Sequence, residues 1–577
     1  MQLINGEALF SPSDLTQAAA CEFALLRRLD VKLGRTEDRS IPEDPLVMRA
    51  AGLGDKHEQR VLADYKERFR SGVVEIDRPA ASDPASLKAA MQLTLQAMEN
   101  GADVVFQGVV FDGDFHGYAD FLIRDSSGAY RVMDSKLARH AKVTALLQIA
   151  AYSDVLQRNG ARIADEGALI LGDMREESFP LGPVVPVYRD RRRKLSELVH
   201  RHIAGDTATS WDYPTILACG RCALCEHKAT ERNDLLLVAG MRMTQRAKLR
   251  DAGVLTVADL ASRTGPVPQI SEKSLSGMRA QAALQMRQQA DGIVDFELFD
   301  PAGLAAIPPP SPGDIFFDFE GDPMWQESGT ATWGLEYLFG CVDPAPDNEP
   351  AFTPFWAHDR RQERQALVDF LEYVCARQRK CPDMHIYHYA AYEKTALLRL
   401  AAMHGLGERQ IDDLLRGNVL VDLYPIVKGS LRVSQPSYSL KKLEPLYMGD
   451  DLRTGDVVTA GDSVIEYAKY CEAVAAGDDV TAQRLIAEIG QYNRYDCVST
   501  FRLRDWLLGL AADHGVTPHG VVAIHDSGTE DASDAPTHSA LVAFAERDEQ
   551  GSRTDEQTAA ALMAAAIGFH QREDKPY

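Results

Sequence analysis

The sequence predicts an α/β protein built from several domains. Its 577 residues are more than one hydrophobic core accommodates, so three or four domains are expected. Apolar or alternating runs at 104–136 and 314–322 predict strands, and stretches of helical periodicity follow both. A proline-rich segment, residues 301–313, lies between the two halves and predicts extended chain without regular structure.

Composition indicates an ordinary globular protein. Apolar residues make up 45% and charged residues 25% of the chain. No apolar run approaches the length that spans a bilayer, and the first residues lack a signal-peptide pattern. We therefore expect a cytoplasmic protein with no membrane partner. The nine cysteines are unevenly spread, which favours reduced thiols or metal ligands over a disulfide framework.

Changes in composition divide the chain into five predicted regions. These are a first α/β domain at 1–230, a small helical region at 231–300, the linker at 301–313, a second α/β domain at 314–515 and a tail at 516–577. The tail begins with acidic, Ser- and Gly-containing sequence at 525–539, which predicts a flexible linker. Alanine-rich sequence follows and predicts a helical element that is cut short.

The first domain carries residues suited to a divalent ion. Strands are expected at HGYADFLIR and YRVMDSK, with DSSG between them as a turn. Because side chains alternate along a strand, Asp134 and Lys136 share a face, and the turn can bring Asp120 beside them. Two carboxylates can hold Mg²⁺, and a lysine can orient water or neutralise charge that develops on phosphorus.

This pattern resembles the RecB-like branch of the PD-(D/E)xK nucleases, which have a restriction-endonuclease-like core. A helix-borne His, an Asp on one strand, D/E-x-K on the next and Q-x-x-x-Y on the following helix occur in the family's order. The resemblance implies a role for each matching position. The roles are metal binding by His57, Asp120 and Asp134, catalysis by Lys136, and substrate positioning by Gln148 and Tyr152.

Three cysteines in CGRCALCEH, namely Cys219, Cys222 and Cys225, have the C-x₂-C-x₂-C spacing of a metal-binding loop. The fourth ligand would be Cys21 or, in a zinc site, His227. Iron–sulfur members of the RecB-like group place one cysteine before the nuclease core and three after it. The resemblance therefore implies a [4Fe–4S] cluster that includes Cys21, with Zn²⁺ as the alternative. The other five cysteines lack ligand spacing and are expected in cores.

Short helical pieces are expected between the cysteines and the proline-rich segment, separated by AGM and AGV turns. They look like a helix-hairpin-helix, which offers backbone amides to phosphates without reading sequence. The alternative is a helical spacer that binds nothing.

The second domain contains another set of acidic residues. Asp318 and Glu320 in DIFFDFEGD share one face of a strand, and Tyr492 and Asp496 in YNRYDC lie four apart on one side of a helix. The set resembles the DEDDy exonucleases of the ribonuclease H-like fold, more particularly the YprB-type domain. By that resemblance the carboxylates hold Mg²⁺ or Mn²⁺ and Tyr492 orients the attacking water.

The middle motif of that family, N-x-x-x-F-D, is altered here. HYAAYE places His388, Tyr392 and Glu393 at the Asn, Phe and Asp positions, so Glu393 is the implied ligand. Asp422, at the end of the apolar run VLVDLYPIV, is a rival ligand. Two lysines in SQPSYSLKKLEPLY are expected to contact phosphate, Lys441 and Lys442.

Together the halves resemble the N-terminal part of a bacterial family in which both nuclease domains precede a superfamily 1 helicase. No G-x-x-x-x-G-K-[ST] loop occurs, so a helicase would be a partner in trans or a part missing from this sequence. The implied function is a metal-dependent nuclease that acts on DNA single strands or ends in repair, recombination or defence. The alternatives are a ribonuclease and a non-catalytic, nucleic-acid-binding adaptor of a helicase.

The net charge of −23 is unfavourable for binding nucleic acid, so basic residues must act locally. Two strips are candidates, residues 25–35 and 188–202. Binding through such confined strips should be weak and salt-sensitive.

Overall fold

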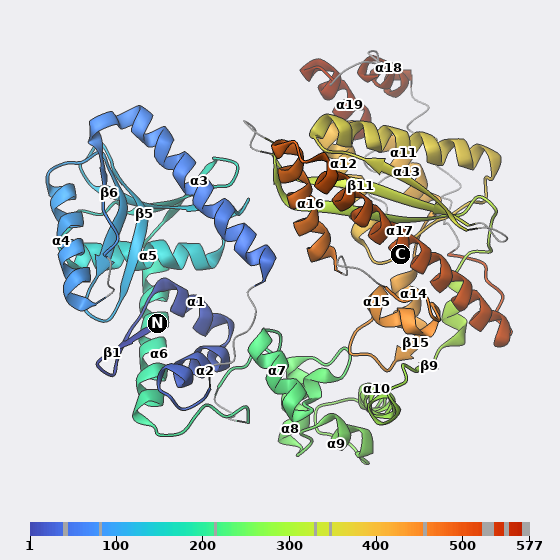
Figure 1. Ribbon diagram of the computed structural model, residues 1–577, viewed down its shortest axis with the longest axis horizontal. Helices are drawn as coiled ribbons and strands as arrows, with labels where there is room; N and C mark the ends of the chain where they lie inside the picture. The colour runs from blue at the N-terminus through green and yellow to red at the C-terminus, as the bar shows by residue number, and fades with distance from the viewer. Residues whose placement is uncertain are drawn as a thin grey trace. The chain divides into compact units, whose positions relative to one another are not determined.

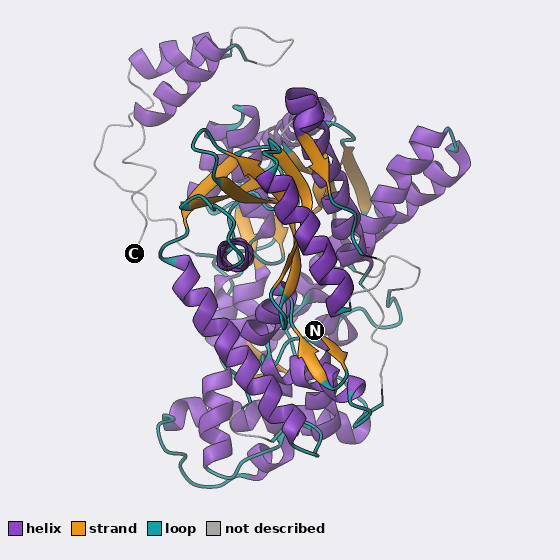
Figure 2. Ribbon diagram, turned by 90° about the vertical axis from the view of Figure 1, so that its left-hand side faces the viewer, coloured by secondary structure: helices purple, strands orange, loops and turns teal. Residues whose placement is uncertain are grey.

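The computed structural model contains two compact units, Met1–Asp234 with Ser328–Trp333, and Leu235–Glu327 with Gly334–Tyr577 (Figure 1). It describes residues 1–37, 44–79, 83–212, 216–327, 332–344, 349–453, 459–521, 536–546 and 553–567. Strands and helices occur in both units (Figure 2). The prediction of an α/β protein with more than one domain is therefore confirmed. The five predicted domain boundaries stay predictions.

The first unit is organised around a six-stranded mixed sheet with the order β3-β4-β5-β6-β7-β8. Its strands are β3 (Val73–Glu75), β4 (Val104–Phe111), β5 (His116–Arg124), β6 (Tyr130–Lys136), β7 (Glu166–Leu171) and β8 (Glu176–Pro180). Neighbours are antiparallel except for β3 with β4 and β6 with β7. The parallel β6–β7 pair requires a crossover, which α5 (Val143–Arg158) provides.

Helices cover both faces of this sheet, because alternation along the strands divides the apolar side chains between two cores. Val105 and Leu122 belong to a core shared with α4 (Pro84–Glu99), α5 and α6 (Val184–Ala204). Phe106 and Phe121 face the other way and pack against α3 (Pro45–Phe69). The remaining elements of the unit are β1 (Gln2–Ile4), β2 (Glu7–Leu9), α1 (Pro12–Ala20), α2 (Glu22–Lys32) and α7 (Ala223–Arg232).

The predicted turn at DSSG joins β5 and β6. Asp125 Oδ1 accepts a 2.8 Å hydrogen bond from the backbone N–H of Ser127, and Gly128 has φ +79°, which glycine adopts without strain. The antiparallel register of the two strands then brings Asp120 and Asp134 to neighbouring positions.

The second unit begins with a small helical region. It contains the 3₁₀ helix Leu235–Leu237, α8 (Met243–Asp251), α9 (Val257–Ser262) and α10 (Glu272–Asp291), which share a core of their own. The AGM and AGV turns are present, since Gly240 and Gly253 have φ values of +78° and +77°. The binding of phosphates by this region stays a prediction.

A five-stranded sheet follows, with the order β12-β11-β10-β13-β14. Its strands are β10 (Ile315–Gln326), β11 (Trp333–Asp343), β12 (Ala351–Trp356), β13 (Ile386–His388) and β14 (Leu420–Asp422). β10, β13 and β14 run parallel, whereas β12 is antiparallel to β11. A separate pair is formed by β9 (Phe296–Leu298) and β15 (Leu431–Val433).

The two faces of this sheet also have separate cores. Phe317 and Phe319 of β10 pack with α11 (Arg360–Lys380), α12 (Tyr392–His404) and α13 (Glu408–Arg416). Phe316 faces the opposite core, which includes residues of α14 (Leu423–Ser430) and α17 (Asp479–Asp513). The same side of the unit carries α15 (Leu440–Leu443), the 3₁₀ helix Glu444–Leu446 and α16 (Ala460–Ala476).

The proline-rich segment is not extended throughout, so that prediction is wrong. Pro301–Ala306 forms a 3₁₀ helix, and Leu304 and Ile307 are fully buried in the α14–α17 core. Proline is compatible with this helix because Pro301 stands at its start, where a missing backbone N–H breaks no hydrogen bond.

The C-terminal part contains α18 (Pro536–Ala545) and α19 (Asp555–Ile567). Most of the predicted acidic linker, residues 525–539, lies outside the described residues. Among the helices of the described ranges, none combines the length and apolar content that crossing a bilayer requires.

Candidate metal centres

Three carboxylates meet in the second unit. Asp318 and Glu320 lie on β10, and Asp496 lies on α17, which packs against that strand. One ligand oxygen from each residue lies within 4.8 Å of the other two. Because Phe317 and Phe319 point into the opposite core, strand alternation turns both acidic side chains of β10 toward α17. This acidic triad could hold a divalent metal.

The triad is electrostatically strained without a cation. Burial raises the pKa of Glu320 to about 8, and the neighbouring Asp496 contributes to the shift. Burial likewise raises the pKa of Asp318 well above its usual range, with further contributions from Asp496 and Glu320. Closely spaced buried carboxylates resist simultaneous ionisation, and a bound divalent ion would relieve their repulsion.

Glu393 lies beside the triad, but its carboxylate is not among the groups whose ligand oxygens all lie within 4.8 Å of one another. Its carboxylate is hydrogen-bonded to Asp318 and lies 3.1 Å from His388 Nδ1. The rival residue, Asp422, has a structural contact instead, since its Oδ1 accepts hydrogen bonds from the backbone N–H groups of Ala390 and Tyr424, at 2.8 and 2.9 Å. Asp422 thereby caps α14, whereas the buried Glu393 contacts Asp318 and is paired with His388.

Tyr492 lines the triad on the face of α17 that also carries Asp496. Its side chain is buried, and burial together with the charges of Asp496 and Glu320 raises its pKa. The phenol therefore stays protonated and can donate a hydrogen bond at neutral pH. Lys441 lies near it, with its ammonium 5.4 Å from the ring centroid, whereas Lys442 is exposed.

Asn493 is a site residue that the motifs did not indicate. Its Nδ2 donates a 2.9 Å hydrogen bond to Asp318 Oδ2, and its side chain is fully buried. Gly340 on β11 makes room for it, because a Cβ at that position would lie 1.6 Å from Asn493 Oδ1. The only sequence signal was its place inside YNRYD, next to Tyr492.

Arg453 is the second residue that sequence reasoning missed. Its guanidinium forms ion pairs with Glu444 and Asp496. It also stacks on two rings, 5.4 Å from the centroid of Tyr492 and 4.7 Å from that of Tyr495. No spacing pattern links Arg453 to the acidic motifs, because the loop that carries it approaches α17 only in the folded chain.

In the first unit, Asp120, Asp134 and Lys136 also lie together. Ser135 donates from its backbone N–H and its hydroxyl to Asp120 Oδ2, both at 2.9 Å, and Lys136 forms an ion pair with Asp134. Burial and the Asp120 charge raise the pKa of Asp134 well above its usual range. Burial acts to lower the pKa of Lys136, but Asp134 and Asp120 outweigh it and raise that pKa.

The helix that follows contributes the two predicted positioning residues. Gln148 Nε2 donates hydrogen bonds to Asp134 Oδ1, at 3.0 Å, and to the hydroxyl of Tyr152, at 3.2 Å. Tyr152 also lies tightly against Gly117 on β5, where a Cβ would be 2.3 Å from its ring. The Q-x-x-x-Y pair therefore reaches the acidic pair, and its role in positioning substrate stays a prediction.

Both ring nitrogens of His57, the predicted metal ligand, already contact other groups of the protein. Its Nε2 lies 3.2 Å from the carbonyl oxygen of Ile170, and its Nδ1 lies 3.0 Å from Arg60. Among the described residues, no three acidic or histidine side chains around Asp120 and Asp134 have ligand atoms that all lie within 4.8 Å of one another. Both ring nitrogens have protein partners, so a ligand role would require His57 to exchange one of them.

The four predicted cysteines converge at one point. Cys21 stands between α1 and α2, and the other three, Cys219, Cys222 and Cys225, lead into α7, yet all four sulfurs lie within 4.8 Å of one another. Cys21 Sγ is 3.5 Å and Cys219 Sγ 3.8 Å from Cys225 Sγ. Hydrogen bonding between the two thiols lowers the pKa of Cys21 and raises that of Cys225, so without a metal one proton is retained between these sulfurs. His227, the alternative fourth ligand, is not in this group.

The two predicted basic strips are partly neutralised by nearby acids. In the strip at 188–202, Arg189 pairs with Asp154 at 2.6 Å and Arg192 with Asp112 at 2.7 Å. Arg193 and Lys194 both pair with Asp190, and in the strip at 25–35 both Arg27 and Arg35 lie within 3.9 Å of Asp30. These ion pairs reduce the charge available for phosphates, but among the described residues Arg28, Lys32, Arg191 and Arg201 form no ion pair, so part of the charge of both strips stays free.

Residues 315–508 match a family model described as RNase_H superfamily. The match spans the five-stranded sheet and most of α17, including Asp318, Glu320 and Asp496. No curated protein matches the chain. The C-terminal part is therefore an RNase H-like domain, and its acidic triad suggests a metal-dependent nuclease. The likeness of the first unit to RecB-like nucleases stays a prediction.

Proposed function

We propose that this protein is a metal-dependent nuclease that cleaves single strands or ends of DNA. The observation that carries the proposal is the convergence of the half-buried Asp318 and Asp496 with the buried Glu320 in an RNase H-like domain. The three carboxylates repel one another, and a bound cation would relieve this repulsion. A domain that only bound nucleic acid would gain nothing from such a cluster, so its presence supports cation binding.

In the RNase H-like domain, the triad would hold Mg²⁺ or Mn²⁺, with Glu393 as a further ligand. A bound divalent ion supplies charge neutralisation and Lewis-acid polarisation of a phosphodiester. Tyr492 would orient the attacking water through its protonated hydroxyl, and Asn493 would hold Asp318 in place. Lys441 would offset negative charge on the strand that enters the site.

The first unit would supply a second cleavage centre of the RecB-like type. Support comes from Asp120 and Asp134 on neighbouring strands, the ion pair of Lys136 with Asp134, and the contact of Gln148 with Asp134. Lys136 would neutralise charge on phosphorus or orient water. One centre would then nick or resect while the other trims ends, in repair, recombination or defence, together with a helicase partner.

The four-cysteine group would hold a metal centre that ties the α1–α2 region to α7. A Zn–S bond is about 2.3 Å, so the sulfurs of a tetrahedral zinc site lie about 3.8 Å apart. The sulfur distances of 3.5 and 3.8 Å are close to that value. We therefore favour Zn²⁺, while the predicted [4Fe–4S] cluster, in which each sulfur binds a different iron, remains the alternative.

Cleavage of end-labelled DNA and RNA oligonucleotides with Mg²⁺ or Mn²⁺ tests the proposal. Asp318→Asn should abolish cutting by one centre and Lys136→Ala cutting by the other. Asp513→Asn, an exposed position at the end of α17, and Lys88→Ala, an exposed position on α4, are the matched controls. RNA cleavage without DNA cleavage would assign a ribonuclease. Binding without any cleavage would assign the adaptor function and overturn the proposal.

A further inference from the structure

One short segment of the first unit carries unneutralised positive charge. Residues 136–142, KLARHAK, contain four basic residues and no acidic one, in a chain of net charge −23. Lys136 pairs with Asp134. Within the described part of the chain, however, no carboxylate forms an ion pair with the side chain of Arg139, His140 or Lys142. The charges of Arg139 and Lys142 are therefore not offset by an acidic partner, which makes this segment an anion-binding candidate.

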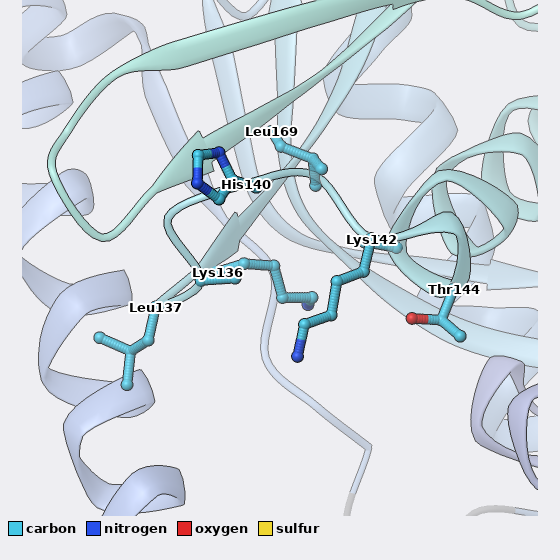
Figure 3. Close-up of a pocket in the computed structure, with 8 residues that line it drawn as sticks. Lys136, Leu137, His140, Lys142, Thr144 and Leu169 are labelled. Carbon is cyan, nitrogen blue, oxygen red and sulfur yellow. The ribbon is translucent and has the colours of Figure 1, made fainter. Parts of the chain in front are cut away.

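The segment forms the wall of a pocket of about 230 Å³ between the end of β6 and the start of α5. Lys136, Lys142 and Thr144 contribute polar groups to it, above an apolar floor that includes Leu169. Figure 3 draws Lys136 and Lys142 among the residues that line the pocket, with Thr144 on the first turn of α5. The ammonium of Lys142 and the hydroxyl of Thr144 beside a small hollow suit a phosphate group, whereas the ammonium of Lys136 is paired with Asp134.

The backbone at the same place favours an anion as well. Lys142 is the N-cap residue of the 16-residue helix α5, and its carbonyl accepts the backbone hydrogen bond of Ala145, at 2.9 Å. Its ammonium group has no acceptor with which to cap the helix. The first N–H groups of a helix are orphan donors near the positive end of its dipole, and Thr144 and Ala145 of the first turn of α5 line the pocket.

The pocket is continuous with the acidic pair through Lys136, which lines it and also contacts Asp134. We propose that this pocket binds a backbone phosphate of the nucleic-acid strand, beside the phosphodiester that lies at Asp120 and Asp134. The inference rests on the proposed nuclease function of the first unit. It assigns Lys142 and Thr144 to strand binding, whereas Lys136 serves the cleavage centre.

Binding of a strand can be measured separately from its cleavage. Full-length protein is titrated into fluorescein-labelled 12-nucleotide DNA and RNA with Ca²⁺ in place of Mg²⁺, over a range of salt concentrations. Lys142→Ala should weaken binding about five-fold, as expected for one exposed charge contact. The slope of log affinity against log salt should fall by about 0.7, the value for one single-strand phosphate. Lys142→Arg should retain binding, and Lys88→Ala is the control.

Neutral methylphosphonate linkages, introduced one position at a time, provide the sharper test. One position should weaken binding to the wild type and have no further effect on Lys142→Ala. Equal binding and equal salt slopes for Lys142→Ala and Lys88→Ala would overturn the inference. So would competition by inorganic phosphate without any sensitive linkage, because the pocket would then bind free phosphate. Loss of binding in Lys142→Ala with unchanged cleavage in Lys136→Ala would uphold the pocket and reject the first-unit cleavage centre.

Discussion

Arg453 forms an ion pair with Asp496 at the acidic triad and a second pair with the buried Glu444. The guanidinium thus occupies the side of the triad where the loop after α15 meets α17. Its positive charge partly offsets the carboxylates that would hold a metal. The same contact gives Asp496 a fixed position before any ion binds.

Removal of this guanidinium should destabilise the domain and impair cleavage. Arg453→Met leaves Glu444 buried without its partner, which should cost about 3 kcal/mol of unfolding free energy, measured by urea denaturation. The double variant Arg453→Met/Glu444→Gln should recover most of that stability but not the cleavage. Full activity in the double variant would show that Arg453 has no role at the metal site.

Metal binding at the triad should strengthen with pH. The raised pKa of Glu320, about 8, means that the folded metal-free domain prefers the protonated carboxyl. That stabilising contribution is complete below the ordinary carboxyl pKa and is lost as the pH rises through about 8. A divalent ion needs the carboxylate, so Mn²⁺ affinity should rise up to about ten-fold per pH unit below pH 8. Calorimetric titration at pH 6.5, 7.5 and 8.5 measures this rise.

The control for the pH dependence is Glu320→Gln, which removes the titrating group. Its residual Mn²⁺ affinity should be weaker and less dependent on pH. An affinity for Mn²⁺ that stays constant over this range in the wild type would contradict the assignment of Glu320 as a ligand.

Gly340→Ala should disturb the metal site indirectly, through the side chain of Asn493. The added Cβ would lie 1.6 Å from Asn493 Oδ1, so Asn493 must move away from Asp318. We expect a loss of about 2 kcal/mol of unfolding free energy and a large fall in cleavage rate. Gly509→Ala, in the helix α17 with open space around its Cβ, should instead be neutral or slightly stabilising. Equal behaviour of the two variants would refute the role of Asn493.

Metal removal should destabilise the first unit through its cysteines. Cys21→Ser should lower the melting temperature and the bound metal content, because the centre joins segments nearly two hundred residues apart. Cys375→Ser on α11, outside the metal-binding groups of the described residues, is the control. A colourless preparation that contains zinc would support the single-ion site, whereas a broad visible absorption would identify the iron–sulfur alternative.

Local patterns in the sequence determined which residues of the acidic sites lie on the same face of a strand or helix. The two-residue period of β10 put Asp318 and Glu320 on one face, the four-residue spacing on α17 put Tyr492 with Asp496, and the DSSG turn brought Asp120 to Asp134. These relationships depend on backbone geometry within one element or one hairpin, so they can be derived from neighbouring residues alone.

Only the tertiary structure determined the contacts between residues that are far apart in the sequence. It placed Arg453 on Asp496, Asn493 on Asp318, and Asp422 at the start of α14 rather than at the metal site. It also paired Arg189, Arg192, Arg193 and Lys194 with acids, whereas within the described part of the chain Arg139, His140 and Lys142 form no ion pair. Sequence spacing carries no information on these outcomes, because burial and long-range packing determine which charges meet.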